Sequence, residues 1–365
     1  MRIVIVNVAA TCGGALSVLT DFYNDICSNP CGHQWIFIVS TPVLEETADV
    51  KVRRVPWVFR SWWHRIYWEL FVASKVIDEY KPDVVLTLQS TMVLRTKIPQ
   101  VVYVQQAIPF QKLQRFSFLK KKERVLAFYQ YFYGYLIKRS IVNAAAVVMQ
   151  SQYLKDAASD IDQKLAGKIH VIPPKVKIPE YISTDSHKPC TLNRFFYPAA
   201  YLVYKNHKCI FEAMKYLLET DKRDFSVSLT VSAGEIRNDI GKFKPDLWRN
   251  LQLTGRIKRD EVLRKYGETV LVFPSYIESF GMPLCEAMMA GTLILAADCP
   301  YAREVIGEYR NAYFFDPFDS RKLAELMLKA INGEIGRINE KTKIRKTENR
   351  SMVEVLENVA GKQSL

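Results

Sequence analysis

Short apolar segments alternate with helix-like segments along the chain, and this alternation limits the fold more than any other feature. Residues 2–9 are dominated by Ile and Val, and Gly13 and Gly14 then form a turn before apolar residues recur at helical spacing. Further apolar runs of strand length stand at 35–40, 84–89, 101–106, 145–150 and 168–174. Because alternating strands and helices form parallel sheets covered on both faces, residues 1–175 are predicted to form a doubly wound, Rossmann-like α/β domain.

The same alternation returns after residues 176–190, a stretch rich in Pro, Ser, Thr and charge that we interpret as a linker. Strands are predicted at 194–200, 226–233, 250–255, 269–275 and 292–298, and helices at 206–219, 259–267, 283–291 and 320–332. The sequence therefore predicts a second Rossmann-like domain at 191–345, with a ligand cleft between the domains. A C-terminal helix is expected at 346–365, with a return to the N-terminal domain as one option.

The formal net charge of +13 favours a polyanionic partner such as nucleic acid, an anionic membrane or a phosphorylated substrate, without choosing among them. No uninterrupted apolar run approaches the roughly 20 residues of a membrane span. The short apolar N-terminus leads directly into a Gly-rich turn, so it is predicted to be a strand rather than a signal peptide. None of the seven cysteines forms a C-x-x-C pair. We therefore expect buried thiols in a reducing compartment and no zinc site.

Two glutamates flank a turn between two apolar segments in residues 274–298, PSYIESFGMPLCEAMMAGTLILAAD. Pro283 suits the first turn of a helix and Gly291 suits its end, which places Glu278 in a strand-to-helix loop and Glu286 one turn into the helix. Backbone N–H groups of the loop and the helix start suit a phosphate, and carboxylates accept hydrogen bonds from sugar hydroxyls. The combination predicts a nucleotide-sugar site at the carboxyl end of a strand.

The two-glutamate motif in ESFGMPLCEAMMAG closely resembles that of the retaining glycosyltransferases of family 4, which have two Rossmann-like domains in the GT-B architecture. The resemblance covers most of the chain and includes YKN at 204–206, LTGRI at 253–257 and the N-terminal GG. More loosely, the first half is similar to bacterial capsule and O-antigen transferases. The resemblance implies transfer of a sugar from a nucleoside-diphosphate donor, most commonly UDP, to a lipid-linked saccharide. We expect a cytoplasmic enzyme that is peripheral on the inner face of the cell membrane and needs no cofactor. It should need no metal, because Lys205 and the helix start would supply the positive field that a cation would otherwise provide.

The resemblance further implies roles for individual residues. Glu278 would be the catalytic residue that approaches the donor-sugar hydroxyls, and Glu286 would bind the ribose. Lys205, followed by Asn206, would neutralise the diphosphate. The other implied donor-binding positions are Gly13 and Gly14, the loop residues Ser279, Phe280 and Gly281, and Arg256 in the nucleobase loop.

Two departures from the family pattern leave an alternative open. Ala200 stands where the family usually has an Arg on the diphosphate, so Lys205 would carry that charge alone or with Arg256. Gln105 and Gln106 stand where the family often has a His, and they are the acceptor-side candidates. Gln cannot act as a general base, although in retaining transfer a donor phosphate oxygen can take the acceptor proton. The alternative is a catalytically silent GT-B protein that serves as the partner subunit of another transferase.

Two segments of the first half, 51–75 and 111–141, mix basic and aromatic residues. The first holds four of the six tryptophans, and the second holds Lys120, Lys121 and Lys122 before a run of aromatics. Rings and cations together suit an anionic membrane surface, and the alternative is a core helix with a solvated basic edge. A nucleic-acid partner would leave the two-glutamate motif unexplained, so none is expected. The D-x-D at 160–162 is interpreted as surface charge rather than a metal site.

Overall fold

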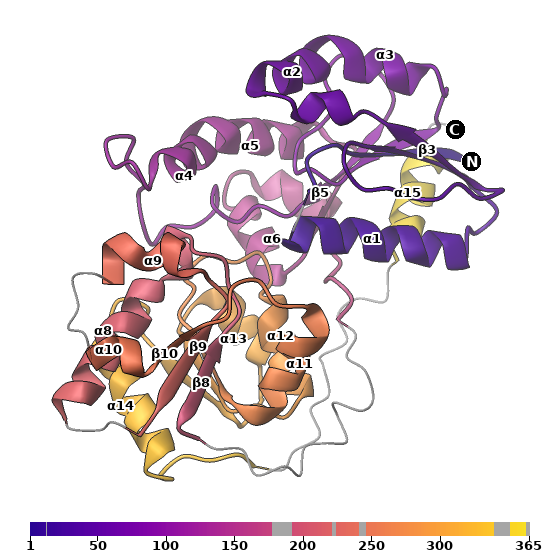
Figure 1. Ribbon diagram of the computed structural model, residues 1–365. Coiled ribbons are helices and arrows are strands. Elements are labelled where there is room, and N and C mark those ends of the chain that lie inside the picture. The colour runs from indigo at the N-terminus through magenta and orange to yellow at the C-terminus, as the bar shows by residue number, and fades with distance from the viewer. Residues whose placement is uncertain (12, 177–191, 221–223, 241–245, 339–350, 363–365) are drawn as a thin grey trace. The chain divides into compact units, whose positions relative to one another are not determined.

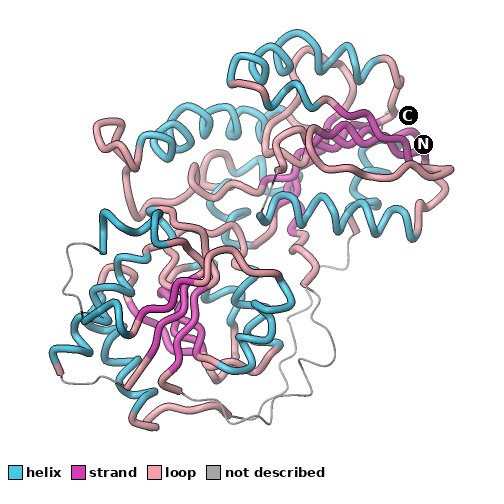
Figure 2. Tube along the Cα trace, in the orientation of Figure 1, coloured by secondary structure: helices cyan, strands magenta, loops and turns pink. Residues whose placement is uncertain are grey.

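The computed structural model describes residues 1–11, 13–176, 192–220, 224–240, 246–338 and 351–362, in two compact units (Figure 1). Unit 1 comprises Met1–Lys175 with Thr347–Leu365, and unit 2 comprises Val176–Lys346. Each unit has a central sheet with helices on both faces (Figure 2), so the predicted α/β fold class is confirmed. All but the first residue of the predicted linker at 176–190 lies outside the described residues.

The sheet of unit 1 is fully parallel, with the strand order β3-β2-β1-β4-β5-β6-β7. Its strands are β1 (Arg2–Asn7), β2 (Gln34–Val39), β3 (Val50–Arg54), β4 (Val84–Thr87), β5 (Gln100–Val104), β6 (Ala146–Met149) and β7 (Ile169–Val171). The order reverses between β1 and β4. Such a reversal is a topological switch point, and open α/β sheets bind ligands at the carboxyl ends of the strands that form it.

The two faces of β1 contribute to two separate hydrophobic cores. Ile3 and Ile5 pack with residues of α1 (Gly13–Ser28) and α15 (Met352–Gly361). Val4 and Val6 pack on the opposite face with Trp68 and α3 (Ala73–Asp78). The C-terminal helix α15 therefore completes a core of unit 1, and its Glu357 lies 2.9 Å from the His33 ring nitrogen Nε2.

Each basic, aromatic segment contains a helix with a π-helical turn in the middle. The first consists of η1 (Pro56–Phe59), α2 (Trp62–Tyr67), π-helical η2 (Trp68–Val72) and α3. The second consists of α4 (Arg124–Phe128), π-helical η3 (Tyr129–Tyr133) and α5 (Gly134–Asn143). Among the described residues, no helix has both the length and the apolar character needed to cross a membrane. π-Helical turns are rare and are frequent at functional sites.

The D-x-D sequence at 160–162 lies between the two remaining elements of unit 1. They are α6 (Gln152–Ser159) and η4 (Gln163–Lys168). Asp160 pairs with Lys112 at 2.9 Å, and the Asp162 carboxylate accepts a hydrogen bond from the Lys164 N–H at the start of η4. Both acids therefore have local structural partners.

The sheet of unit 2 is also fully parallel, in the order β10-β9-β8-β11-β12-β13. Its strands are β8 (Arg194–Tyr197), β9 (Ser226–Leu229), β10 (Leu251–Leu253), β11 (Val270–Phe273), β12 (Ile294–Ala297) and β13 (Ala312–Phe315). Helices α8 (His207–Glu219), α10 (Asp246–Arg249) and α14 (Ser320–Ile331) cover one face, and α11 (Arg259–Glu268), α12 (Met282–Met289) and α13 (Pro300–Ile306) cover the other (Figure 1). The helix α9 (Ala233–Ile240) follows β9. The switch point of this unit lies between β8 and β11.

The thiols differ between the units. Cys209, Cys285 and Cys299 in unit 2 are buried, as expected, and burial raises the pKa of each to about 12. Cys27 and Cys31 in unit 1 are exposed, so the expectation of buried thiols is wrong for them. Cys27 occupies the last turn of α1, and Cys31 follows in the turn to β2.

Candidate functional site

The loops after β8 and β11 meet at the switch point of unit 2 and bring two opposite charges together. Lys205 ends the short helix η5 (Val203–Lys205), and Glu278 lies in the loop between β11 and α12. The Lys205 Nζ lies 2.5 Å from the Glu278 Oε1, and the two side chains are only 18% and 15% exposed. This part of unit 2 therefore holds a cation and a carboxylate that are both largely shielded from solvent.

Asn206 fixes the position of Lys205 through its backbone and its amide. Its backbone adopts the left-handed conformation with φ of 58°, which Asn tolerates better than most residues. Its Nδ2 donates to the carbonyl oxygens of Pro274 at 3.2 Å and Pro317 at 2.7 Å. The Tyr276 N–H also donates to the Tyr204 oxygen at 3.0 Å. These contacts tie the Lys205 turn to the loop that carries Glu278.

The loop that precedes α12 requires a glycine at its last position. Gly281 has φ of +94°, and a Cβ there would lie 3.3 Å from side-chain atoms of Leu284 and Tyr301. Tyr301 in turn donates its hydroxyl hydrogen to the Ser275 carbonyl oxygen at 2.5 Å. Phe280 is buried beside Gly281, and Ser279 is partly exposed. The chain thus passes tightly from Glu278 into α12, whose first N–H groups have no acceptor within the helix.

Glu286 lies on α12 and pairs with a base from the neighbouring helix α11. Its Oε1 lies 2.9 Å from the Arg259 Nη2, and its Oε2 accepts a hydrogen bond of 3.4 Å from the buried Tyr266 hydroxyl. Burial raises the pKa of Glu286 above its ordinary value, while Arg259 and Tyr266 act in the opposite direction. The side chain of Glu286 is 10% exposed and that of Arg259 is 48% exposed, so the pair opens to solvent through the arginine.

Arg259 was missed by the sequence analysis, which proposed Arg256 as the helping base. Arg256 is exposed in the loop after β10 and acts electrostatically on Glu235. Arg259 is the first residue of α11, three positions further along the chain. Its contact with Glu286 joins two helices, so no local pattern in the sequence indicates it.

His207 opens α8 next to the Lys205 turn and is buried between two rings. Its ring centroid lies 5.0 Å from that of Tyr197 and 5.1 Å from that of Tyr201. Burial, with a further contribution from the Lys205 charge, lowers the pKa of His207 to about 4. The imidazole is therefore neutral near pH 7 and adds no charge beside Lys205.

The other predicted site residues lie in unit 1. Gly13, with φ of +66°, and Gly14 open α1 after β1. The Gln105 side chain donates from Nε2 to the Leu88 oxygen at 2.9 Å, and the Gln106 Oε1 accepts the Ile108 N–H at 3.2 Å. The structure thus places Lys205, Asn206, the 278–281 loop and Glu286 in unit 2. Gly13, Gly14, Gln105 and Gln106 lie in unit 1, after the carboxyl ends of its strands.

The unit 2 residues form an arrangement suited to a ligand with both phosphates and hydroxyls. Lys205 and Arg259 are cations, the start of α12 carries a partial positive charge, and Glu278 and Glu286 can accept hydrogen bonds. In the part of the chain that the structure describes, no group of three or more His, Cys, Asp or Glu residues is placed to hold a metal ion.

Comparisons with known proteins agree with this arrangement. The family model described as "Glycosyl transferases group 1" matches residues 182–350, and the model described as "Glycosyltransferase Family 4" matches residues 30–178. A sequence search of curated proteins finds no match.

Solved structures share the fold at low sequence identity. WaaG, a glycosyltransferase involved in lipopolysaccharide biosynthesis, is 16% identical with a TM-score of 0.66, over 91% of this chain and 90% of that chain. HepE from Anabaena, in complex with UDP-glucose, is 15% identical with a TM-score of 0.60, over 92% of this chain and 90% of that chain. TarM is 14% identical with a TM-score of 0.54 over 72% of this chain, which spans only 51% of that TarM chain. Since one family model matches each unit and these structures share the fold, the chain belongs to glycosyltransferase family 4 and has the GT-B fold.

Proposed function

We propose that this protein is a retaining glycosyltransferase that moves a sugar from a UDP-sugar to a lipid-linked saccharide in the synthesis of a bacterial surface polysaccharide such as capsule or O-antigen. The observation that carries the proposal is the shielded Lys205–Glu278 pair at the switch point of unit 2, directly before the start of α12. UDP is the proposed nucleotide because HepE, which shares the fold, was solved with UDP-glucose.

Each residue of the site has a part in the proposed reaction. Lys205 and the start of α12 stabilise the diphosphate as it leaves the sugar. Glu278 accepts hydrogen bonds from the transferred sugar, and Glu286 accepts them from the ribose. The bond between the anomeric carbon and the phosphate oxygen breaks, the acceptor oxygen bonds to the same face of that carbon, and the acceptor proton passes to a phosphate oxygen.

The reaction is proposed to need no metal ion. Lys205 and the helix start supply positive charge where the diphosphate would lie, which is the part that a divalent cation plays elsewhere. Activity should therefore survive EDTA. Complete loss with EDTA, restored by Mn²⁺ or Mg²⁺, would contradict this part of the proposal.

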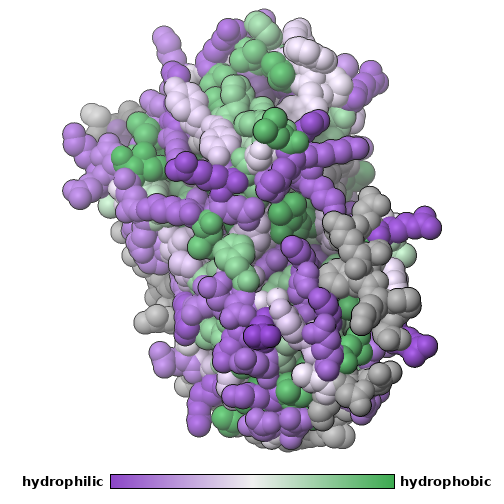
Figure 3. All heavy atoms as spheres, turned by 90° about the vertical axis from the view of Figure 1, so that its left-hand side faces the viewer, coloured by the Kyte–Doolittle hydropathy of each residue, from purple (hydrophilic) through white to green (hydrophobic). Residues whose placement is uncertain are grey.

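A lipid-linked acceptor and an anionic membrane surface are proposed from the exposed rings of unit 1. Trp63 and Phe118 are 79% and 52% exposed, and Leu119, directly before Lys120, is 90% exposed. On the face drawn in Figure 3, hydrophobic areas are scattered among hydrophilic side chains rather than joined into one apolar surface. Exposed rings beside cations suit peripheral contact with headgroups at the inner face of the cell membrane.

The function is tested first by nucleotide binding. A ligand at a hundred times its dissociation constant stabilises a protein by about 2.7 kcal/mol, so UDP should raise the unfolding temperature more than GDP, CMP or ADP do. Lys205→Met should abolish most of the UDP response, whereas the exposed Lys215→Met should leave it intact. The purified protein should then hydrolyse one UDP-sugar slowly without acceptor. No response to any nucleotide would favour a catalytically silent partner subunit.

A further inference from the structure

Unit 1 has a pocket at its own switch point. A cavity of about 390 Å³ lies beside the loop that follows β1, and it is lined by Phe59, Ser61, Trp62, Arg65, Tyr129 and Tyr133, together with loop residues after β1. All of these residues belong to unit 1, so the pocket is defined within that unit. Its position matches the place where open α/β sheets bind their ligands.

Aromatic rings form much of the wall of this pocket. Tyr129 and Tyr133 are the first and last residues of the π-helical turn η3, and their ring centroids are 5.2 Å apart. Residues four positions apart lie on one face of a helix, so both rings line the same pocket. Trp62 reaches the pocket from α2 and is 63% exposed, so one of the largest rings is available to a ligand.

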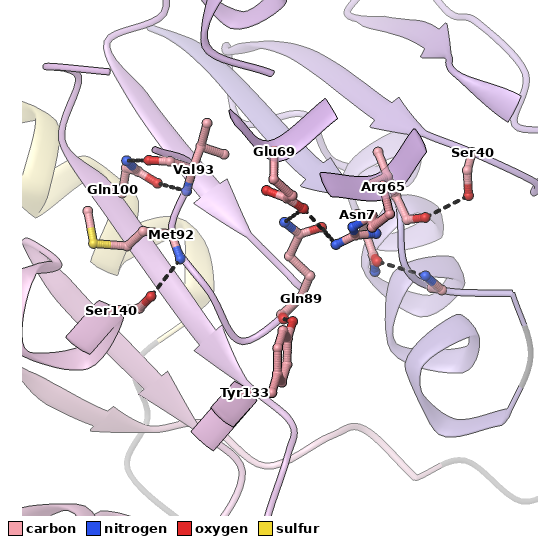
Figure 4. Close-up of polar contacts among 12 residues, drawn as sticks. Asn7, Ser40, Arg65, Glu69, Gln89, Met92, Val93, Gln100, Tyr133 and Ser140 are labelled. Atoms are coloured by element: carbon pink, nitrogen blue, oxygen red, sulfur yellow. Dashed lines mark hydrogen bonds and ion pairs between the residues drawn. The ribbon is translucent and has the colours of Figure 1, made fainter. Parts of the chain in front are cut away.

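Arg65 is the charged residue of the pocket wall, and its charge is already compensated. Its Nη2 lies 2.7 Å from the Glu69 Oε1 and donates to the Gln89 Oε1 at 3.1 Å, while the Gln89 Nε2 donates to the same Glu69 oxygen at 3.1 Å (Figure 4). The Tyr133 hydroxyl donates to the Gln89 carbonyl oxygen at 3.2 Å. Gln89 follows β4, which is one of the two strands that form the switch point.

The network leaves donors for a ligand but no uncompensated positive charge. Within the described chain, the side-chain contacts of Arg65 run through Nη2, so Nη1 and Nε remain to donate. An anionic ligand would need an unpaired cation, whereas hydroxyls need only donors and acceptors.

We propose that this pocket binds one uncharged sugar ring of the acceptor, with Trp62, Tyr129 and Tyr133 against the faces of the ring and Arg65 donating to its hydroxyls. The C–H faces of a sugar ring pack on aromatic rings, and its edge presents hydroxyls to polar groups. Glu69 and Gln89 act as positioning residues, since both hold Arg65 and the Glu69 carboxylate balances its charge. The proposal rests on the proposed function, because it names the class of sugar that the acceptor carries.

The first test measures binding of methyl glycosides to the full chain by saturation-transfer NMR. The panel is the neutral methyl glycosides of glucose, galactose, mannose, N-acetylglucosamine and N-acetylgalactosamine, with methyl glucuronide and methyl galacturonide as charged counterparts. At least one neutral glycoside should bind, and Trp62→Ala should weaken it about tenfold. The matched control is Trp63→Ala, since Trp63 is 79% exposed and does not line this pocket. Absence of binding by every neutral glycoside, or equal loss in both tryptophan variants, would overturn the proposal.

The second test addresses the charge of the pocket. Glu69→Gln keeps the shape of the side chain but leaves Arg65 uncompensated, so the ratio of glucuronide to glucoside binding should rise about tenfold. An unchanged ratio would overturn the selection of an uncharged ring. Tyr135→Phe, at an exposed position on α5, should change nothing, whereas Tyr133→Phe should weaken binding by releasing Gln89.

The same samples separate this inference from the proposed function. UDP thermal shifts report on unit 2, and glycoside binding reports on the pocket of unit 1. If UDP stabilises every variant but no glycoside binds, the pocket assignment alone is wrong. If glycosides bind and no nucleotide does, unit 1 has a sugar pocket and the transferase proposal fails.

Discussion

Lys205 and Glu278 lie 73 positions apart in the chain, and their side chains form an ion pair of 2.5 Å. The pair exists because β8 and β11 are neighbours in the sheet although they are separated in sequence. In the donor-free protein each charge compensates the other. A bound diphosphate would compete with Glu278 for the lysine and leave the carboxylate to the sugar hydroxyls.

Removing one partner of this pair should cost stability as well as activity. Lys205→Met leaves the Glu278 carboxylate shielded and unpaired, which should lower the free energy of unfolding by about 1–3 kcal/mol. The double variant Lys205→Met with Glu278→Gln should recover most of that loss. Urea unfolding of donor-free protein measures both, and Lys215→Met serves as the control, because the Lys215–Glu219 pair is half exposed. A double variant as unstable as the sum of its single variants would show that the pair is not coupled.

The kinetic effects of the two glutamates should differ. Glu278→Ala should chiefly lower kcat, because its contacts strengthen as charge develops on the sugar. Glu286→Ala should chiefly raise the donor KM, since ribose contacts are the same in the ground state and the transition state. Steady-state kinetics with varied donor distinguish the two. Equal and small effects from both substitutions would contradict the assigned roles.

Glu286 should also carry a measurable stability cost near neutral pH. Its raised pKa means that the folded state binds the proton more readily than the unfolded state, so its stabilising contribution is present below the ordinary value of 4.5 and is lost as pH rises through the folded pKa. Glu286→Gln should therefore unfold at a higher urea concentration than the parent at pH 7, and the gain should vanish as pH falls below 4.5. Glu308→Gln, at an exposed position, is the control. If Glu286→Gln were less stable than the parent at pH 7, the Glu286 carboxylate would stabilise the fold there, and the prediction would be wrong.

His207 should make the protein sensitive to acid. Its folded pKa of about 4 lies below the ordinary 6.5, so its contribution is present above 6.5 and is lost as pH falls from there through 4. The full loss is about 3 kcal/mol. His207→Phe keeps a ring between Tyr197 and Tyr201 and should flatten the stability profile over this interval. If the stability of the variant and of the parent fell in parallel as pH falls, His207 would not be the cause of the acid sensitivity.

Membrane binding should depend on both lysines and rings of unit 1. Each Lys near an anionic surface contributes about 1 kcal/mol, so reversing Lys120, Lys121 and Lys122 to Glu should release the protein from anionic liposomes at moderate salt. Trp63→Ala should weaken the part of the binding that persists at high salt.

Liposome co-sedimentation measures these effects. The matched control reverses three lysines of unit 2, Lys208, Lys215 and Lys322, and has the same net charge. Activity on a short, water-soluble acceptor should persist in both triple variants. If the parent protein does not bind anionic vesicles, the exposed rings and lysines are not a membrane-binding surface. The proposal of a lipid-linked acceptor would then lose its main supporting observation.

The sequence predicted most strands, because buried parallel strands are continuous apolar runs. β3 was missed, since this edge strand has Val50 buried and Val52 partly buried, while its other three residues are exposed Lys and Arg. β13 and α13 were missed as well: β13 is a partly exposed edge strand, and α13 spans only seven residues. The π-helical turns had no signature, because they depend on how each helix packs against the rest of unit 1.

The candidate site shows the same division between local and tertiary information. Glu278, Gly281 and Glu286 stand in one short motif. The residue types of that motif predict a loop followed by a helix. The partner of Glu286 is Arg259 from another helix, and the network of Arg65, Glu69 and Gln89 joins two elements of unit 1. Such contacts arise only when the sheet order brings distant segments together.

The helix α15 has a consequence for how the chain acquires its structure during synthesis. It supplies Val355, Leu356, Val359 and Ala360 to a core whose other buried members lie before residue 176. The ribosome therefore completes unit 2 before it delivers the last piece of unit 1. One face of the unit 1 sheet therefore lacks α15 while about 170 further residues are translated, at roughly 5–20 residues per second. A protein cut before α15 would therefore lose part of a hydrophobic core rather than a dispensable tail, and we expect it to aggregate.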